Sequence, residues 1–404
     1  MRIQGLKKQR LVIAISIISI ISLSSFLSLV IHAKRKDFSW IENNEYFQFD
    51  FAKGIAYFGD FSVNGLSEQK HMDDIQEMTG NGSDFISLTT FWYQDYLNST
   101  VIYNTSSTHN LTSVGNYIDD LHGINTKVQF KPMLDVRTGE WRSWIIPSEA
   151  WWVSWHNWTL MMAELAYNHS VEIFCVGCEM GNTEGNVTQW RNLIHEIRQK
   201  YPTLKLTYAA NWDAYFRIEW WDELDFIGLD AWFPLTTKLD PTVDELRNSW
   251  NGIAQYLEQV SKQWNRPILF TEMGYQSRDG CNIMPWDVKF RLVLDYQEQA
   301  DCYEAFLTSN VYTAPWFAGC FWWAWHPEEQ FWQNDTSDPT SWIFNHSPNG
   351  KLAGDVINEY YHKPRIEATD LSYWNYIGLT WTLTCIPLVS LVMIYLKKRG
   401  GAER

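Results

Sequence analysis

Residues 171–180 read VEIFCVGCEM, an apolar run that ends with a carboxylate at Glu179. A short run rich in Val, Ile and Phe is typical of a fully buried strand. Because a carboxylate is unfavourable inside an apolar core, we expect Glu179 to lie where this strand leaves the core and meets a pocket. The stretch RPILFTEMGY, residues 266–275, repeats the arrangement with Glu272. The two stretches together predict two strand-end carboxylates.

Eight strand-like runs follow one another along the chain, separated by segments whose apolar residues recur with helical spacing. This alternation predicts parallel βαβ units, and eight of them predict an α/β fold, a (β/α)8 TIM barrel over residues 52–345. A doubly wound open sheet is the alternative, disfavoured because no Gly-rich phosphate-binding fingerprint follows the first run. The runs are residues 52–59, 84–93, 127–136, 171–180, 204–211, 225–233, 267–275 and 319–326. The predicted helices are residues 71–80, 114–123, 155–168, 187–201, 243–264 and 288–309.

Two apolar segments flank the predicted barrel. Residues 11–31 carry no charge and are long enough to cross roughly 30 Å of hydrocarbon. We interpret residues 1–33 as a cytoplasmic basic stub followed by a signal anchor, with a cleaved signal peptide as the alternative. Residues 373–396 form a second predicted transmembrane helix, and the basic tail 397–404 favours a cytoplasmic C-terminus. The sequence therefore predicts a membrane protein that has the bilayer as a partner.

The segment between the two apolar stretches is expected to be luminal or extracellular, with residues 34–51 as a linker and 346–372 as a luminal stalk. Its Asn-x-Ser/Thr triplets exceed the number expected by chance, which indicates a surface exposed in the secretory pathway. The acceptors are Asn81, Asn98, Asn104, Asn110, Asn157, Asn168, Asn186, Asn334 and Asn345.

The cysteines carry two further expectations. In an oxidising compartment Cys281 and Cys302 are a candidate disulfide pair. Cys175 and Cys178 have CxxC spacing, but residues i and i+3 of a strand point to opposite faces. We interpret these two as core thiols and predict neither a redox pair nor a metal site there. No other cluster has metal-ligand spacing, and no cofactor is predicted.

Composition narrows the ligand class. The net charge is −15 and the predicted barrel has no Lys/Arg patch, so nucleic acid is not an expected partner. The chain holds 24 Trp among its 404 residues, more than core packing and membrane belts account for. Because indole faces stack on the apolar faces of sugars, we expect an oligo- or polysaccharide substrate.

In a TIM barrel the active face lies at the carboxyl ends of the strands. Glu179 ends the fourth predicted strand and Glu272 the seventh, so the two would face each other across the mouth. Two carboxylates facing a sugar cleft are the requirement for glycoside hydrolysis, and a separation of about 5–5.5 Å allows one to act as a nucleophile. The alternative is that each Glu is a strand-end residue in an ion pair.

An ordered set of motifs supports the catalytic interpretation. Over residues 52–345 the chain resembles the clan A retaining glycosidases and, within them, glycoside hydrolase family 113. The known members of that family are β-mannanases. The motifs that carry the resemblance are KPMLDV, GEWR, WWVSWHNW, FCVGCEM, YAANWD, FIGLDAWFPL, FTEMGYQSRDG and FWWAWHP.

The resemblance implies that Glu179 is the general acid/base and Glu272 the nucleophile. It also implies substrate contacts from Trp92, Lys131, Asp135, Asn211, Trp212, Asp230 and Trp323. Two positions depart from the clan pattern. Cys178 replaces the Asn that bonds the sugar 2-hydroxyl, and Trp232 replaces a Tyr whose phenol holds the nucleophile, a role that Trp232 or Tyr275 would then take.

The leading hypothesis is a membrane-anchored retaining β-glycoside hydrolase, acting on β-mannosidic or related β-linked glycans by double displacement. A non-catalytic glycan-binding receptor or scaffold on the same barrel is the second hypothesis. A transglycosylase is the third, because a sugar can replace water in the second step.

Overall fold

The computed structural model describes residues 38–59, 66, 69–326 and 342–367. Residues 1–44 and 45–404 form two separate compact units. In the first unit the described residues form turns, and everything below concerns the second. Both predicted transmembrane segments lie outside the described residues, as does Asn334. Among the helices that are described, none is long and apolar enough to cross a bilayer.

Eight parallel strands close into a barrel in chain order, with the last strand hydrogen bonded to the first. This confirms the predicted (β/α)8 barrel and excludes the open sheet, which would leave its outer strands unpaired. The strands are β1 (Ala52–Tyr57), β2 (Phe85–Gln94), β3 (Lys127–Val136), β4 (Ile173–Cys178), β5 (Lys205–Asn211), β6 (Ile227–Asp230), β7 (Ile268–Met273) and β8 (Phe317–Trp322).

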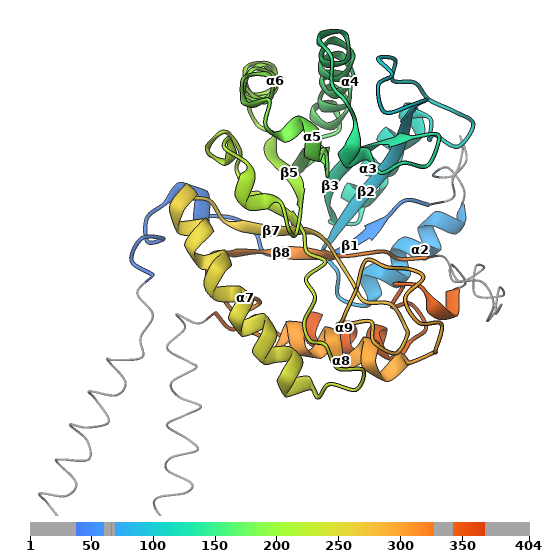
Figure 1. Ribbon diagram of the computed structural model, residues 1–404, viewed down its shortest axis with the longest axis vertical. Helices are drawn as coiled ribbons and strands as arrows, with labels where there is room; N and C mark the ends of the chain where they lie inside the picture. The colour runs from blue at the N-terminus through green and yellow to red at the C-terminus, as the bar shows by residue number, and fades with distance from the viewer. Residues whose placement is uncertain (1–37, 60–65, 67–68, 327–341, 368–404) are drawn as a thin grey trace, which may run out of the picture. The chain divides into compact units, whose positions relative to one another are not determined.

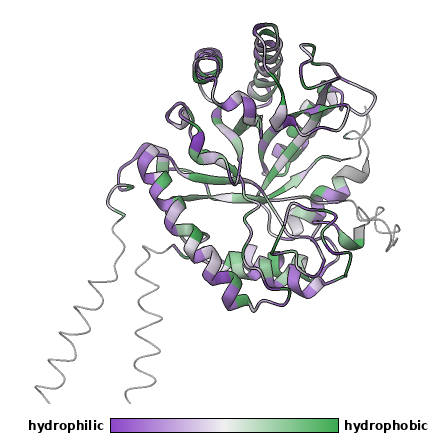
Figure 2. Ribbon diagram, in the orientation of Figure 1, coloured by the Kyte–Doolittle hydropathy of each residue, from purple (hydrophilic) through white to green (hydrophobic). Residues whose placement is uncertain are grey.

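The helices lie outside the strands, with α7, α8 and α9 together on one side in Figure 1. Polar and apolar residues alternate along α7 (Figure 2), as expected for a helix with one buried face. The α-helices are α2 (Gln69–Gly80), α3 (Leu111–Gly123), α4 (Glu149–Asn168), α5 (Gly181–Glu184), α6 (Val187–Lys200), α7 (Val243–Trp264), α8 (Tyr296–Leu307) and α9 (Leu352–Tyr361). The 3-10 helices are η1 (Glu45–Phe47), η2 (Arg142–Trp144), η3 (Tyr215–Arg217), η4 (Trp221–Glu223) and η6 (Trp342–Phe344).

Several predicted boundaries need correction, and α4, for example, begins at Glu149 and not at residue 155. Helix α8 begins at Tyr296 and not at residue 288, because the Asp295 side chain accepts a hydrogen bond from the backbone N–H of Glu298 and caps the helix there. The described part of the predicted stalk contains α9, which packs against the barrel. The Tyr361 hydroxyl lies 3.6 Å from Cys320 Sγ of β8, and Lys53 of β1 donates to the Tyr361 carbonyl.

The barrel interior is filled in two layers. The layer near the strand starts contains Phe85, Ile173, Phe226, Leu269 and Phe321. The layer below the mouth contains Ala56, Phe58, Phe91, Met133, Cys175, Cys178, Ala209 and Ala324, with Tyr93 and Trp323 against it. Large aromatic residues such as Phe85 and Phe91 combine with small ones such as Ala56 and Ala209 to fill the interior.

Both CxxC thiols belong to that upper layer, which confirms them as core thiols but corrects the expected geometry. Cys175 pairs with Thr207 and Cys178 with Ala209, so β4 holds one residue more than β5 between the two pairs. This bulge changes the alternation of β4, and therefore both sulfurs face the interior.

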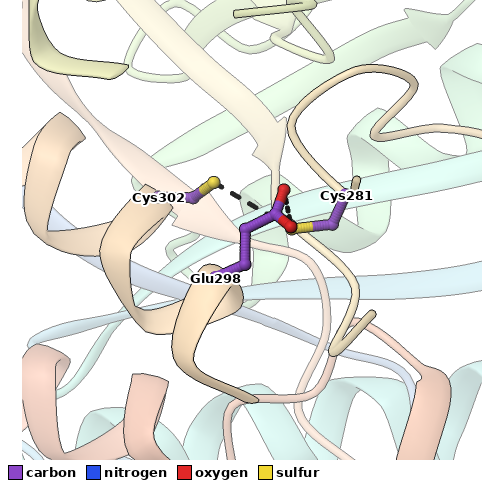
Figure 3. Close-up of side chains that lie close together, drawn as sticks. All are labelled: Cys281, Glu298 and Cys302. Atoms are coloured by element: carbon purple, nitrogen blue, oxygen red, sulfur yellow. Dashed lines mark hydrogen bonds between the residues drawn. The ribbon is translucent and has the colours of Figure 1, made fainter. Parts of the chain in front are cut away.

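The predicted Cys281–Cys302 disulfide is not formed in the structure. Both cysteines are buried free thiols, with their sulfurs 4.0 Å apart (Figure 3), about twice the length of an S–S bond. The Cys281 thiol lies 3.6 Å from Glu298 Oε1. The same oxygen accepts a bond of 2.7 Å from the Asn282 amide, so the Glu298 side chain fastens this loop to α8.

Close packing of β1 against β8 gives a test of the barrel core. A methyl group at Gly54 would lie 2.3 Å from the Phe321 ring and 2.6 Å from the Cys320 carbonyl oxygen. We expect Gly54→Ala to lower the free energy of unfolding of the full-length chain by about 1–3 kcal/mol. Gly252→Ala on α7 is the matched control. It meets no atom within 4 Å, and chemical denaturation should show it unchanged or stabilised by about 0.5–1 kcal/mol. A wild-type stability for Gly54→Ala would contradict the packing described here.

Candidate active site

The bulge in β4 delivers Glu179 to the mouth of the barrel. Glu179 follows the last residue of the strand, and its N–H donates to the carbonyl of Ala209 on β5 at 2.8 Å. Its φ of 51° lies in the left-handed region, which a residue with a side chain rarely adopts. The chain therefore turns sharply at Glu179, between the strand and the short helix α5.

The Glu179 carboxyl has two hydrogen-bond donors from the segment after β3. Trp141 Nε1 donates to Oε2 at 3.1 Å and Arg142 Nη1 to the same oxygen at 3.2 Å. Burial raises the pKa of Glu179, the Arg142 guanidinium opposes that effect, and repulsion by Glu272 adds to it. A raised pKa favours the protonated form of a carboxyl, which is the form that a general acid requires.

Glu272 lies on β7 in a different environment. The strand holds an extra residue here relative to both neighbours, and the buried Glu272 carboxylate accepts a hydrogen bond from the ammonium of Lys131. Lys131 Nζ also lies 3.8 Å from Asp230 Oδ1, and Thr271 Oγ1 donates to that oxygen at 2.8 Å. One ammonium thus serves two carboxyl groups from two adjacent strands.

The charges of this buried group are interdependent. Burial opposes the charge on Lys131, but attraction by Asp230 and Glu272 outweighs burial and raises the Lys131 pKa. Burial and then repulsion by Glu272 raise the pKa of Asp230 to about 8. A proton held on Asp230 leaves one ammonium facing one carboxylate, that of Glu272. Cys178 Sγ, 3.3 Å away, donates to Asp230 Oδ2.

Two clusters of the described residues have the donor atoms for a metal ion. Cys178, Asp230 and Glu272 form one, and Cys281, Glu298 and Cys302 the other. In the first cluster the Lys131 ammonium already bonds to a carboxylate, which places a cation where a metal would bind. In the second cluster both Glu298 oxygens already accept hydrogen bonds, one from the Gly280 N–H and one from the Asn282 amide.

The structure brings several predicted site residues to the mouth. Asp135, at the end of β3, accepts a bond of 3.0 Å from Arg142 Nε. The ring of Trp323 lies 5.2 Å from Lys131 Nζ. Asn211 ends β5 beside Asp230 of β6, and its Oδ1 is buried without a hydrogen-bond partner in the described part of the chain.

Trp92 and Tyr275 face away from the mouth, and Trp232 packs beside a histidine. Trp92 lies on the outer face of β2, between the inward-facing Phe91 and Tyr93. Its ring packs against Trp158 of α4, with the ring centroids 6.3 Å apart. Tyr275 is buried with its ring 6.3 Å from that of Tyr303 on α8. The centroid of the Trp232 ring lies 5.1 Å from that of the His346 ring. Neither Tyr275 nor Trp232 is a hydrogen-bond partner of Glu272 among the described residues, so Lys131 takes the role expected of them.

Sequence reasoning did not assign Trp141 and Arg142 to the site. Their signal was the GEWR motif directly after the third strand. Together with Tyr93 and Asp135 they line a groove of about 570 Å³. Trp141 is 39% exposed and Trp144 54% exposed, with ring centroids 6.2 Å apart, so two indole faces are open to a ligand beside Glu179.

A second aromatic pair flanks the site near the ends of β5 and β7. Trp212 stacks on Trp286 with ring centroids 5.3 Å apart, and Trp286 is 44% exposed. A further hollow, of about 770 Å³, is lined by residues such as Phe85, Ile173 and Phe226 near the strand starts. Neither Glu179 nor Glu272 lines this hollow. The active face of this fold lies at the other end of the barrel, at the carboxyl ends of the strands.

A closed parallel barrel with strand-end carboxylates on β4 and β7 defines a (β/α)8-barrel glycoside hydrolase. The chain belongs to glycoside hydrolase family 113, whose model matches residues 57–345. A solved family 113 β-1,4-mannanase is 26% identical, with a TM-score of 0.68 over 78% of this chain and 100% of the other. The family 113 β-mannanase of Alicyclobacillus acidocaldarius, solved with the ligand ManMIm, is 25% identical, with a TM-score of 0.68 over 78% of this chain and 99% of the other. Curated protein sequences gave no significant match.

The environment of Glu179 predicts where it titrates. We expect its carboxyl to titrate above the ordinary value of 4.5 because burial is the largest influence on its pKa. Arg142→Met should move the titration to still higher pH, since removing the positive charge disfavours the carboxylate. The measurement is the ¹³C carboxyl titration, assigned by subtracting the spectrum of Glu179→Gln.

Arg191→Met provides the control, because Arg191 bonds to Asp222 and Glu223 and has no contact with Glu179 among the described residues. This substitution should leave the titration unchanged. A Glu179 carboxyl that titrates at or below 4.5, or that does not respond to Arg142→Met, would contradict the electrostatic description.

Proposed function

We propose that the chain is a retaining β-glycoside hydrolase that cleaves β-mannosidic or related β-linked glycans by double displacement. The observation that carries the proposal is the unequal environment of two strand-end carboxylates. Glu179 has the raised pKa of an acid, whereas Glu272 is bonded to the Lys131 ammonium. Such a pair divides the work between a proton donor and an ionised nucleophile.

In the first step a carboxylate oxygen of Glu272 attacks the anomeric carbon while the Glu179 proton passes to the glycosidic oxygen. The C–O bond to the leaving sugar breaks, and a glycosyl ester of Glu272 forms. In the second step Glu179 takes a proton from water, whose oxygen attacks the anomeric carbon and releases the Glu272 carboxylate. Lys131 orients Glu272 before the attack and again after its release, and Arg142 stabilises the Glu179 carboxylate that is present while the glycosyl ester exists.

The substrate class rests on two supports. The most specific similarities are to family 113 enzymes described as β-mannanases. The half-exposed indoles of Trp141 and Trp144 lie beside Glu179, on the side where a leaving sugar would sit. Trp212, which follows β5, stacks on Trp286 and offers a second aromatic surface. Two separated aromatic platforms suit a glycan of several units.

The decisive measurement is sugar release by the full-length chain from β-1,4-mannan oligosaccharides and a panel of other β-linked glycans. We expect release from mannan, with the first-formed sugar in the β configuration by ¹H NMR. Glu272→Gln should reduce turnover by at least about 10³-fold, because no covalent intermediate can form. Glu172→Gln is the matched control: Glu172 accepts bonds from the Val128 N–H and His122, away from the mouth.

Inverted product, or full activity of Glu272→Gln, would sink the double-displacement mechanism. No release from any glycan by folded protein would support the glycan-receptor hypothesis in its place.

We further propose that the barrel is luminal or extracellular and is anchored through the apolar segments 11–31 and 373–396. The Asn-x-Ser/Thr acceptors support this placement. Asn98, Asn104 and Asn157 are exposed, which leaves them available to the glycosylation machinery. Asn345 differs, because its Oδ1 accepts bonds from the Ser347 N–H and the Lys351 ammonium, each 3.0 Å away.

When the chain is produced in a eukaryotic secretory pathway, we expect glycans on Asn98, Asn104 and Asn157 but none on Asn345. Peptide mass spectrometry after glycosidase treatment in H₂¹⁸O measures occupancy at each site. The protein should also stay with membranes after alkaline carbonate washing, and deletion of residues 373–404 together with 1–33 should release it. An unglycosylated barrel, or full extraction of the intact chain by carbonate, would contradict this topology.

A further inference from the structure

A buried tyrosine and a buried glutamate lie directly behind Glu179, and the mechanism above does not use them. Tyr208 is on β5, with its ring centroid 5.3 Å from that of Trp190 and 5.0 Å from that of Trp220. Its hydroxyl donates to Glu184 Oε1 at 2.7 Å and accepts a hydrogen bond of 2.8 Å from the backbone N–H of Met180. Tyr208 is fully buried and Glu184 is 5% exposed, so water does not compete freely for these bonds.

The Met180 N–H belongs to the peptide unit that follows Glu179. The N–H that precedes the Glu179 side chain donates to the Ala209 carbonyl. Two consecutive residues of β5, Tyr208 and Ala209, therefore hold the backbone on both sides of Glu179, one by its side chain and the other by its main chain. The direction of the Glu179 side chain is set by these two bonds.

The backbone of Glu179 needs such a restraint. Its φ of 51° is left-handed, and a residue with a Cβ persists there only when the surrounding structure fixes it. Without the Tyr208 hydroxyl the Met180 N–H would be buried without its acceptor, which is unfavourable. The chain at Glu179 could then relax by rotation about both its φ and its ψ bonds, which would relieve both costs and turn the Glu179 carboxyl away from its present position.

Glu184 determines which way the tyrosine hydroxyl points. A phenol has one proton, and the Glu184 carboxyl accepts it, so a lone pair of the oxygen faces Met180. Glu184 is itself held at the end of α5, where its backbone carbonyl accepts a bond of 3.1 Å from Trp220 Nε1. The order of dependence runs from Glu184 through Tyr208 to the Glu179–Met180 peptide.

We propose that Tyr208 and Glu184 are positioning residues for the general acid: they hold the peptide after Glu179 so that its carboxyl faces the leaving oxygen. The inference rests on the proposed function, in which Glu179 protonates that oxygen. Neither residue touches the substrate, and both act through the backbone of Glu179. Their loss should therefore weaken proton donation and leave attack by Glu272 intact.

The leaving group of the substrate separates these two steps. The ratio kcat/KM reports the reaction up to cleavage of the glycosidic bond. The 2,4-dinitrophenolate of a 2,4-dinitrophenyl β-mannoside departs without being protonated. The phenolate of a phenyl β-mannoside needs a proton from the general acid. We expect Tyr208→Phe to lower kcat/KM for the phenyl substrate by about 10- to 100-fold, as misplacement of a catalytic group does. The change for the dinitrophenyl substrate should stay within about twofold. Glu184→Gln keeps an acceptor oxygen, so its effect should be smaller but show the same preference.

Tyr57→Phe is the matched control. Tyr57 is a buried tyrosine of β1 whose hydroxyl donates to the buried Asp74 of α2 at 2.8 Å, so it loses a comparable hydrogen bond away from Glu179. In Tyr57→Phe the ratio of kcat/KM for the phenyl substrate to kcat/KM for the dinitrophenyl substrate should equal that of the unsubstituted chain. Equal losses for both substrates in Tyr208→Phe, or no loss for either, would overturn the positioning role.

Failure of the proposed function would be visible separately, as an unsubstituted chain that releases no sugar from any β-linked glycan and cleaves neither mannoside. Crystal structures of the chain and of Tyr208→Phe then test the inference by geometry. The Glu179 backbone should leave the left-handed region in the variant. An unchanged φ and an unchanged carboxyl position would overturn the inference without reference to activity.

Discussion

The mouth of this barrel depends on one buried ammonium. Lys131 of β3 reaches across the interior to Glu272 of β7 and Asp230 of β6. Two carboxyl groups with so little access to water would otherwise repel each other, and both would tend to be protonated. The Lys131 ammonium between them reduces this repulsion, so the same interaction that closes the polar end of the core also orients the proposed nucleophile.

Irregular strands, and not regular ones, place the two glutamates. A uniform strand sends alternate residues into the barrel, but β4 gains a residue before Cys178 and β7 gains one before Glu272. Each extra residue re-aims the strand end toward the mouth. The cost is a backbone that needs outside support, and at Glu179 that support comes from β5. Function in this fold therefore rests on the neighbours of the bulged strands as much as on the strands themselves.

Patterns of burial and spacing were sufficient to predict the eight-strand barrel and the two strand-end glutamates, whereas the assignment of Lys131 and Asp230 to the site came from the family resemblance. Residue alternation also held the answer for Trp92, because Phe91 and Tyr93 on either side of it face inward. The family likeness outweighed that alternation in the prediction. What no pattern indicated was the link from Glu184 to Tyr208, since each reads alone as an ordinary residue between apolar neighbours. Such links depend on contacts between different strands and helices, which a single sequence does not encode in any local signal.

Cys178 shows how a replaced residue can redistribute roles in the site. In the clan pattern an amide at this position bonds the sugar 2-hydroxyl, but here the thiol donates to Asp230 and faces inward. The adjacent strand β5 ends in an amide, Asn211, whose Oδ1 is buried with no hydrogen-bond partner in the described residues. A buried polar atom left in this state is unfavourable unless a ligand completes it. A sugar hydroxyl that donates to Asn211 would do so, and the substrate would then supply a bond that the folded chain lacks.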